Sequence, residues 1–482
     1  MASVRRTTFR IRRSRRATGS RLVTPVRRSR VPTFVAVAVA VAGALLTIAP
    51  GASADLVTRE TGAYPGYTLV VPQTTTDTYL LDLDGRVVHS WQSGYLPGLS
   101  ASLRDDGLLT RAGRVTPVPG TFADAPGGQG GVIELLDWES NVVASFEYAS
   151  DEFLQHHDAV SLPNGNVIFL AWQRKSAEEA IAAGRDPETL LEDHVYPDSV
   201  IEVDVERGRV VWEWHVWDHL VQDRDPDKPS YGDPAERPGR IDVNWIHDAE
   251  YTSWIHLNGL AYDPVRDHVV VSSRHFSEVW VIDHATTTEE ARGKKGDLIG
   301  RFGNPEAYGM GTAADRTLFF QHDPEVIPKG LDGAGRILVF NNGDAEGRAF
   351  STVDEIVPVR RGRRFAMRDG VFAARIDQVV PHATAATQPF FDAFISGAQR
   401  LPNGNTLVTE GPVGRVFEMT PGGTRVWEYA NDHFTPGPTV TFEGFEIRPE
   451  RLFEVDRYPA RHPAFKEKGL PPPAPKQGEY SY

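Results

Sequence analysis

The chain has 482 residues, with 51 basic and 65 acidic side chains and a formal net charge of −14 at pH 7. This length suffices for one large domain or two domains of ordinary size. The sequence contains no cysteine, which excludes disulfides, zinc–thiolate centres, cysteine nucleophiles and lipoprotein anchoring. The stability of the fold must therefore come from packing.

The first 54 residues have the order of a secretory signal peptide. They contain eleven arginines and no acidic residue, then an apolar stretch at 31–48, then the small residues Ala52-Ser53-Ala54. We expect cleavage near Ala54 and an exported protein, either secreted or located in the periplasm or cell envelope. Arg5-Arg6 is compatible with twin-arginine export, and a retained membrane anchor is the alternative.

Removal of this segment changes the charge of the chain sharply. The remainder has 40 basic and 65 acidic residues, a net charge of −25. Such a surface repels nucleic acid and anionic membranes, so we expect no nucleic-acid partner and no stable membrane contact. An anionic substrate would need a local positive pocket, which makes Arg274 a residue of interest.

From Tyr64 onward, short β-rich runs alternate with turn signals. Only 177–183 and 187–193 have a clear helical pattern, and the chain holds 44 glycines and 35 prolines. This pattern predicts an all-β fold. The polar, proline-rich stretch 217–244 is expected to be a loop that covers one mouth of the fold. The Pro-rich tail 471–482 is expected to be poorly ordered.

A turn followed by an apolar strand recurs along the chain, and an outer hairpin follows most copies. The copies begin at Leu99, His157, His256, His322 and Ser396. Repeats of roughly 60 to 100 residues with about four strands each indicate a β-propeller. The strands within 67–91 make a sixth unit, closed with help from the C-terminal part. We therefore predict a six-bladed β-propeller over 55–470 with long inter-strand loops.

Three histidines share one position when these units are aligned on their turns: His157, His256 and His322. The innermost strands of a propeller line its channel, so the three side chains should converge on the axis. Asn258 lies two residues after His256 and faces the same side of a strand. Arg274 adds a fixed positive charge and a planar fork of donors. Such a set suits an oxyanion such as sulfate or phosphate.

Each of these residues also has a structural interpretation. A His-Asp pair at the start of a propeller strand is often structural, with the histidine bonding a neighbouring blade. Asn258 can satisfy backbone groups, and Arg274 can pair with a carboxylate. Three histidines can also hold a metal, but a nearby arginine disfavours a second cation, so we predict no metal. A neutral histidine nitrogen can instead attack sulfur or phosphorus while its neighbours stabilise charge on the equatorial oxygens.

The sequence resembles the bacterial arylsulfate sulfotransferases that do not use a nucleotide sulfate donor. The resemblance spans about residues 66–429 and implies a six-bladed propeller and a two-step exchange through a sulfated histidine. It is carried by His156-His-Asp158 with Leu162-Pro-Asn-Gly-Asn166, Trp254-Ile-His-Leu-Asn258, Val271-Ser-Ser-Arg-His-Phe276, Glu278-Val-Trp-Val-Ile-Asp-His284, Arg301-Phe-Gly-Asn-Pro305 and Phe320-Gln-His-Asp323.

By these motifs, His322 matches the family's nucleophile. His256, Asn258 and Arg274 match the residues that hold and polarise the sulfuryl group. His157 matches a further sulfate-contacting histidine that can also act as acid or base, and the adjacent His156 is the alternative contact. Two departures are the missing cysteines, which exclude the disulfide of some members, and the lack of a recognisable N-terminal β-domain, which leaves the oligomeric state open.

We therefore predict an exported aryl-sulfate sulfotransferase. It transfers a sulfuryl group from a small aryl sulfate to a phenol through a sulfohistidine and needs no cofactor. Two alternatives from other classes are a non-catalytic secreted binding propeller and a metal-dependent propeller hydrolase or lyase. Transfer of the sulfuryl group to water, which is sulfatase activity, is a further alternative.

Overall fold

The computed structural model describes residues 56–125, 127–245, 252–362, 364–381, 390–442 and 445–473. The predicted signal peptide, residues 1–54, and most of the predicted tail lie outside these ranges. Within them, no helix is long and apolar enough to cross a membrane. The first residues of the tail are hydrogen-bonded, since Leu83 N donates to Pro473 O at 2.8 Å.

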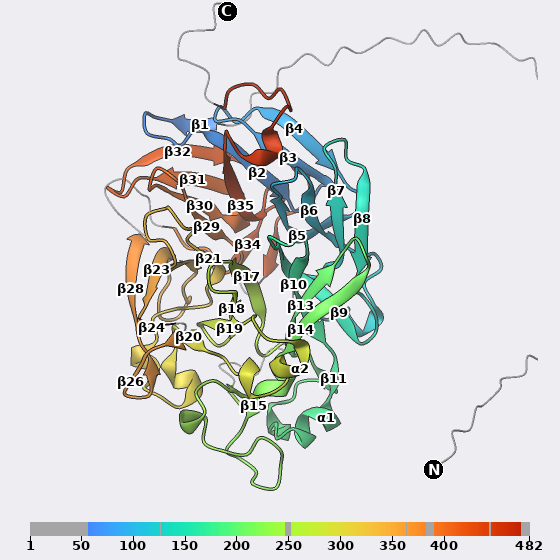
Figure 1. Cartoon of the computed structure of the whole chain (residues 1–482), viewed down its shortest axis with the longest axis vertical. Coiled ribbons are helices and arrows are strands. Elements are labelled where there is room, and N and C mark those ends of the chain that lie inside the picture. Colours follow the sequence, from blue (N-terminus) through green and yellow to red (C-terminus); the bar gives the residue numbers. More distant parts are fainter. Residues whose placement is uncertain are drawn as a thin grey trace, which may run out of the picture. The chain divides into compact units, whose positions relative to one another are not determined.

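Six antiparallel sheets surround a central axis, which confirms the predicted all-β, six-bladed β-propeller (Figure 1). From the inner to the outer strand, the first three blades are β35 (Leu452–Pro459), β2 (Gly66–Pro72), β3 (Asp77–Leu81) and β4 (Val87–Gln92); β5 (Leu96–Leu103), β6 (Leu109–Arg114), β7 (Gly131–Leu136) and β8 (Val142–Glu147); and β9 (Phe153–Ser161), β10 (Val167–Gln173), β13 (Asp198–Asp204) and β14 (Arg209–His215).

The last three blades follow the same order from the axis outward. They are β17 (Leu257–Asp263), β18 (His268–Ser273), β19 (Glu278–Asp283) and β20 (Gly300–Phe302); β21 (His322–Val326), β22 (Ile337–Asn341), β23 (Thr352–Pro358) and β28 (Ala374–Val380); and β29 (Gly397–Arg400), β30 (Thr406–Glu410), β31 (Arg415–Met419), β32 (Arg425–Ala430) and β1 (Leu56–Arg59).

The two ends of the described chain close the ring. The C-terminal strand β35 pairs with β2, with Gly66 opposite Pro459, and so forms the inner strand of the first blade. The N-terminal strand β1 adds to β32 at the outside of the last blade. The prediction that the C-terminal part completes the sixth unit is confirmed.

The blades are hydrophobic because both faces of their middle strands pack against neighbouring blades. Strand β10 is apolar from Val167 to Trp172, and all of these residues are buried. The outer strand β8 instead exposes Val142 and Val143. Continuous apolar runs in middle strands and polar or alternating runs in outer strands follow from this burial.

The helical expectations are confirmed in one case and wrong in the other. Helix α1 (Ala177–Ala182) starts with a capping box between Ser176 and Glu179. The stretch 187–193 forms a single 3-10 turn, Pro187–Thr189, and Leu190 is already extended. The chain has to turn back there because β12 (His194–Val195) pairs with β11 (Lys175–Ser176). A second short helix, α2 (Thr288–Ala291), was not expected.

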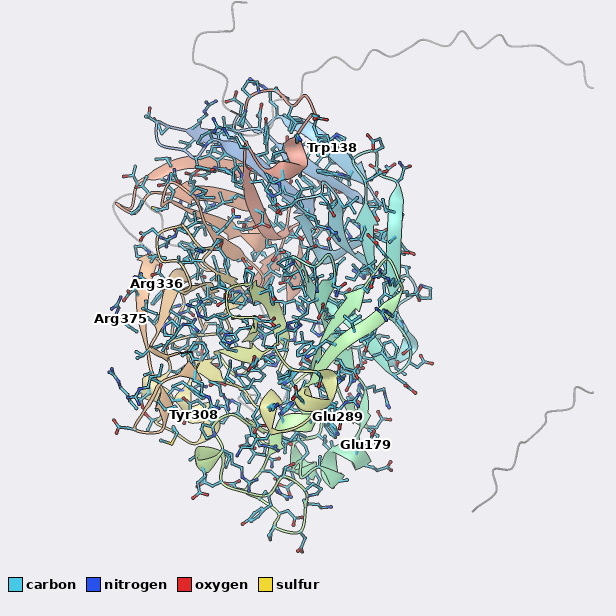
Figure 2. The ribbon with its side chains drawn as sticks, viewed as in Figure 1. Trp138, Glu179, Glu289, Tyr308, Arg336 and Arg375 are labelled. Atoms are coloured by element: carbon cyan, nitrogen blue, oxygen red, sulfur yellow. The ribbon has the colours of Figure 1, made fainter. Side chains whose placement is uncertain are left out.

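The inter-strand insertions carry the remaining short strands. They are β15 (Leu220–Val221) with β16 (Ile241–Asp242), β24 (Arg360–Arg361) with β25 (Arg364–Phe365), β26 (Met367–Arg368) with β27 (Val371–Phe372), and β33 (Val440–Phe442) with β34 (Phe445–Ile447). The stretch 217–244 packs against the fourth blade, where Arg240 O accepts from Arg301 Nη1 at 2.8 Å. Surface and insertion side chains are shown in Figure 2.

The inner strands are joined to one another by side chains that accept backbone N–H groups. Asp158 Oδ2 on β9 accepts from Leu260 N on β17 at 2.8 Å. Asp323 Oδ2 on β21 accepts from Ala398 N on β29 at 3.0 Å. Each acceptor satisfies a buried donor that lies on the free edge of an inner strand. We call these contacts the inner-strand seam.

The seam continues around the ring. Glu325 Oε2 on β21 accepts from Arg400 N at 2.8 Å, Gln399 Oε1 on β29 accepts from Arg457 N at 2.7 Å, and Ser100 Oγ on β5 accepts from Ala159 N at 3.0 Å. Burial in the channel raises the pKa of Glu325 to about 8, with a smaller opposing contribution from its hydrogen bond with Arg400. This carboxyl group is therefore protonated in the folded protein at neutral pH.

Glu325 gives a direct test of the seam. We expect Glu325→Ala to lower the free energy of unfolding by about 1–3 kcal/mol, because Arg400 N loses its acceptor. Glu325→Gln keeps an acceptor oxygen. Because the folded-state pKa of Glu325 is raised, its contribution to stability is complete below its unfolded pKa and is lost as the pH rises through about 8.

The glutamine variant should therefore become more stable than the wild type between pH 5 and pH 9, and the difference should grow with pH. Urea unfolding across this range measures both effects. Equal pH dependence in the wild type and Glu325→Gln would show that the carboxyl group is not buried as described.

Candidate active site

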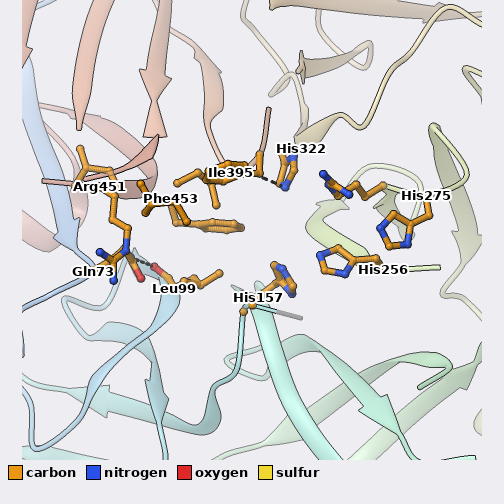
Figure 3. A pocket seen from close by; sticks show the side chains of 15 residues that line it. Gln73, Leu99, His157, His256, His275, His322, Ile395, Arg451 and Phe453 are labelled. Atoms are coloured by element: carbon orange, nitrogen blue, oxygen red, sulfur yellow. Dashed lines mark hydrogen bonds between the residues drawn. The ribbon is translucent and has the colours of Figure 1, made fainter. Parts of the chain in front are cut away.

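One cavity of about 230 Å³ lies where the inner strands meet on the axis (Figure 3). Every blade contributes to its lining from its inner strand or from the one or two residues before that strand. The six contributions are Leu99, His157, His256, His322, Ile395 and Phe453. The predicted convergence of three histidines on the axis is thus what the structure shows.

The backbone is strained at four of these positions, each in a different blade. Leu99, His157, His256 and Ile395 have φ angles of 97°, 49°, 52° and 47°. Such conformations cost about 1–3 kcal/mol each and gather at functional sites. The strands β9, β17 and β21 have register shifts beside the cavity, at bulges that re-aim their side chains toward it.

The three histidines converge without sharing one strand register. His157 lies in the bulge of β9, His256 lies one residue before β17, and His322 is the first residue of β21 and pairs with Phe340. Counting back from the turns missed this difference because the turn lengths differ. Ser161 pairs with Val167, whereas Asp263 pairs with His268 one residue sooner.

His322 is held in a defined orientation and protonation state. Its Nδ1 lies 2.8 Å from Asn342 Oδ1 and 3.1 Å from Phe320 O, which are both acceptors. Nδ1 therefore carries the proton. Its Nε2 accepts from Ile395 N at 3.1 Å, and both residues line the cavity. Burial, and then the charge of Arg274, lower the pKa of His322 to about 3, so the ring is neutral.

The side-chain amide of Asn342 cannot flip without losing hydrogen bonds. Its Nδ2 donates to Asp392 O at 2.7 Å and to Ile395 O at 2.9 Å. Because both donors are used, Oδ1 must face His322. Asn342 was not identified from the sequence, since it lies directly after the next strand, β22, and only the fold brings it to the histidine.

His157 lines the cavity, and His156 lies behind it. The two Nδ1 atoms are 2.8 Å apart, and His156 Nε2 lies 3.0 Å from Asp198 Oδ1. The His156 ring stacks on Trp172 with centroids 4.1 Å apart. The adjacent histidines therefore form a line from the buried Asp198 to the cavity. Burial is the main reason that the pKa of each lies well below its usual value.

The glycine at 128 makes room for His157. A side chain there would place its Cβ 2.2 Å from His157 Cε1, and Gly128 has a φ of 84°. Only glycine combines that backbone conformation with so close an approach. Gly128, which lies in the second blade, thus leaves the space that the His157 ring occupies.

Arg274 and two histidines occupy the fourth-blade side of the cavity. The Arg274 guanidinium lies 4.9 Å from the ring centre of Phe320, and its backbone N donates to His256 O at 3.0 Å. The His256 ring lies 4.8 Å from that of His157 and 5.1 Å from that of His275. Burial, followed by the neighbouring histidines and Arg274, lowers the pKa of His256 well below its usual value.

Asn258 is fully buried and does not line the cavity. Its Nδ2 donates to Gln321 O at 2.9 Å, directly before His322 in the chain. Gln321 Nε2 donates in turn to Ser273 O at 3.1 Å and Glu278 O at 2.9 Å. Asn258 thus ties the strand after His256 to the segment that carries His322, whereas the sequence had predicted a substrate contact.

Several lining residues were not singled out from the sequence. His275 follows Arg274 in the motif Val271–Phe276, so the sequence could have identified it as a candidate site residue. Phe453 lies on the C-terminal strand β35 and Arg451 directly precedes it, and this strand lacks the repeated turn. Ile395 precedes β29 and gave no signal. Among the described residues, no group of three or more His, Asp or Glu is placed to hold a metal ion.

The family model described as Arylsulfotransferase (ASST) matches residues 142–432. The chain belongs to the arylsulfotransferase family. The matched part runs from β8 to just beyond β32 and contains all six residues predicted for the site. Among curated proteins, no sequence relative matches this arylsulfotransferase.

Solved structures resemble this arylsulfotransferase only distantly. A protein of unknown function from Bacteroides caccae is 12% identical, with a TM-score of 0.42, over 81% of this chain and 98% of that one. A functionally unknown protein from Desulfotomaculum acetoxidans is 9% identical, with a TM-score of 0.40 and the same two coverages. A catalytically inactive variant of virginiamycin B lyase from Staphylococcus aureus is 10% identical, with a TM-score of 0.36, over 79% and 90%. These similarities carry no argument about function.

The electrostatics of this cavity can be tested by removing Arg274. We expect Arg274→Met to raise the pKa values of His322 and His157, because a neighbouring cation disfavours their protonated forms. An increase of one unit corresponds to about 1.4 kcal/mol. Imidazole ¹⁵N shifts measured between pH 3 and pH 8 report the change.

Signals are assigned by their loss in His322→Asn and His157→Asn. The exposed Arg448 provides the control, and Arg448→Met should leave both titrations where they are. Identical His322 titrations in the wild type and Arg274→Met would contradict the electrostatic coupling.

Proposed function

We propose that this arylsulfotransferase moves a sulfuryl group from an aryl sulfate to a phenol through a sulfohistidine on His322. The observation that supports this most is the state of His322. Asn342 holds the proton on Nδ1, and burial beside Arg274 keeps the ring neutral. A neutral imidazole that lines a cavity is a competent nucleophile once Ile395 N–H releases the lone pair of Nε2.

In the first step, Nε2 of His322 attacks sulfur. The N–S bond forms as the bond from sulfur to the aryl oxygen breaks, and the phenolate leaves with the electron pair. The ring then carries a positive charge, which the Nδ1–H hydrogen bond to Asn342 disperses. Arg274 and His256 stabilise negative charge on the equatorial oxygens. The phenolate takes a proton from solvent.

Ile395 contributes a backbone donor to this step. Its N–H donates to the same Nε2 that attacks, at 3.1 Å. As the lone pair of Nε2 enters the N–S bond, this N–H can transfer its hydrogen bond to a sulfuryl oxygen. The donor is already in place and needs no reorganisation, which is the property that makes such groups effective in catalysis.

In the second step, a phenol attacks the sulfur of sulfohistidine. His157 accepts the phenolic proton as the new S–O bond forms and the N–S bond breaks, and the electron pair returns to Nε2. The proton then passes from His157 to solvent. His156 and Asp198 lie behind His157 and orient its ring. The low pKa of His157 keeps its ring neutral before the phenol arrives.

The proposal is tested by variants of His322. We expect His322→Ala and His322→Asn to abolish transfer from an aryl sulfate to phenol, because the nucleophile is lost. Wild-type protein given an aryl sulfate without phenol should acquire an acid-labile sulfuryl group on the His322 peptide, detected by mass spectrometry. Initial rates should follow ping-pong kinetics.

The control is His433→Asn, which removes a histidine that stacks on Tyr79 away from the cavity. It should retain both transfer and adduct. Near-normal turnover in His322→Asn would reject His322 as the nucleophile. Release of phenol that does not depend on an acceptor would indicate hydrolysis. Loss of activity with a chelator would favour the metal-dependent alternative.

Asn342 is a positioning residue in this proposal. We expect Asn342→Ala to lower kcat by about 10²-fold with little change in KM, because His322 loses the acceptor that fixes its tautomer. Asn342→Asp keeps an acceptor but adds a charge that favours protonated histidine. The acid limb of its kcat/KM profile should therefore move to higher pH.

Asn341 provides a matched control for Asn342. It is also fully buried, and its Nδ2 donates to Thr317 O at 3.0 Å and to Asp354 Oδ2 at 2.6 Å. Asn341→Ala should lower the melting temperature and leave the pH profile of the folded protein unchanged. A shift of the acid limb in Asn341→Ala but not in Asn342→Asp would contradict the assignment.

A further inference from the structure

The cavity has two different ends. His322, His256 and His275 lie at one end, and Gln73 and Arg451 lie at the other (Figure 3). Leu99, Ile395 and Phe453 lie between these two ends. The other apolar residues that line the cavity are Phe394, Ile447 and Leu452. Phe453 lies close to the reacting end as well, since its ring centre is 6.2 Å from that of His157.

The size of the cavity limits what this arrangement can bind. Its volume of about 230 Å³ is below the roughly 300–1,000 Å³ of pockets that bury drug-sized ligands. A compound with a single aromatic ring fits that space. With its reacting oxygen at His322 and its ring on the apolar wall, the far side of the ring faces Arg451.

Arg451 has no acidic partner within the described part of the chain. Its only side-chain hydrogen bond there is a long one, from Nη1 to Arg448 O at 3.4 Å. Burial, followed by the charge of Arg114, lowers its pKa, and no carboxylate opposes this change. Although the chain has 65 acidic residues, the charged group that acts on the half-buried Arg451 is another arginine, Arg114. Arg451 can therefore bind an anionic group of a ligand.

The wall around Arg451 is fixed rather than adaptable. Gln73 Nε2 donates to Val71 O and to Leu99 O, each at 3.0 Å, and Gln73 N donates to Arg451 O at 3.3 Å. These bonds tie β2, β5 and the start of β35 together. The guanidinium is thus presented from a rigid corner of the cavity.

We propose that Arg451 is a specificity-determining residue that binds an anionic group on the aryl ring, opposite the reacting oxygen. The substrate class is then a phenol, or its sulfate ester, that carries a carboxylate or a sulfonate para to that oxygen. The planar fork of arginine matches either group with two parallel hydrogen bonds. This inference rests on the proposed transfer to phenols and adds the class of phenol.

The test compares acceptors that differ only at the para position. Para-hydroxybenzoate and para-hydroxybenzenesulfonate are anionic, para-hydroxybenzamide is neutral, and para-hydroxybenzylamine is cationic. The wild type should favour the two anions over the amide in kcat/KM by about tenfold, the usual order for a partly buried charge-assisted pair. Which anion is better identifies carboxylate or sulfonate as the preferred group.

Variants then assign the preference to Arg451. We expect Arg451→Met to reduce the ratio of kcat/KM for para-hydroxybenzoate over para-hydroxybenzamide by about tenfold, mainly through KM. Arg451→Glu should favour para-hydroxybenzylamine instead. Arg114→Met removes a nearby charge that does not line the cavity, and it should keep the ratio within about twofold. Thermal unfolding of each variant verifies its fold.

Calorimetric binding of the same four compounds to the full chain separates this inference from the reaction. Stronger binding of the anions than of the amide, lost in Arg451→Met, supports the inference even if no aryl sulfate is turned over. Equal affinity of the wild type for para-hydroxybenzoate and para-hydroxybenzamide would overturn it even if transfer is fast. The inference would also be overturned if Arg451→Met left the ratio of kcat/KM for para-hydroxybenzoate over para-hydroxybenzamide unchanged, or if Arg114→Met lowered this ratio as much as Arg451→Met does.

Discussion

The site depends on the way the inner strands are joined across the channel. A strand at the axis has backbone donors that its own blade cannot pair, and an acceptor from the next blade satisfies them. Asp158 and Asp323 serve this purpose, and each directly follows a cavity histidine, His157 or His322. At a bulge, consecutive side chains can point in different directions. The aspartate then faces the seam while the histidine faces the cavity. The inter-blade bonds that the structural interpretation gave to the histidines of the His-Asp pairs are made by the aspartates instead, and a functional role of the histidines stays a prediction.

The cavity and the inner-strand seam hold different kinds of ionisable group, and this difference would favour transfer of an anionic sulfuryl group. The cavity holds Arg274 and histidines whose pKa values are lowered by burial, while the seam holds carboxyl groups whose pKa values are raised for the same reason. Both effects reduce the number of buried charges, since desolvation penalises the charged form of either group. The fixed charge of Arg274 is what remains beside His322. A chain with a large acidic excess thereby keeps a positive site for an anion.

The sequence predicted what depends on local repetition. Turn spacing was enough for the six blades and for the convergence of His157, His256 and His322. It could not supply the register, because the β17–β18 turn is one residue shorter than the β9–β10 turn. Nor could it supply Asn342, whose partner lies twenty residues away and meets it only across a strand pair. Arg451 could not be identified from the sequence, because it precedes β35. This strand comes last in the sequence but pairs with β2 in the first blade. Spacing within one unit carries no information about such contacts.

Asn342 links His322, the proposed nucleophile, to the backbone that faces it. One amide accepts from His322 Nδ1 and donates to Ile395 O, while Ile395 N donates to His322 Nε2. The three groups form a closed loop of hydrogen bonds around the ring of His322. A β-branched residue with a φ of 47° is costly, roughly 1–3 kcal/mol, so the loop must hold Ile395 there against its own preference. The cost is reasonable if the Ile395 N–H has to stand beside Nε2 before sulfur arrives. A donor placed in advance stabilises a sulfuryl oxygen without waiting for the backbone to move, and that is the advantage a strained but fixed conformation gives a catalyst.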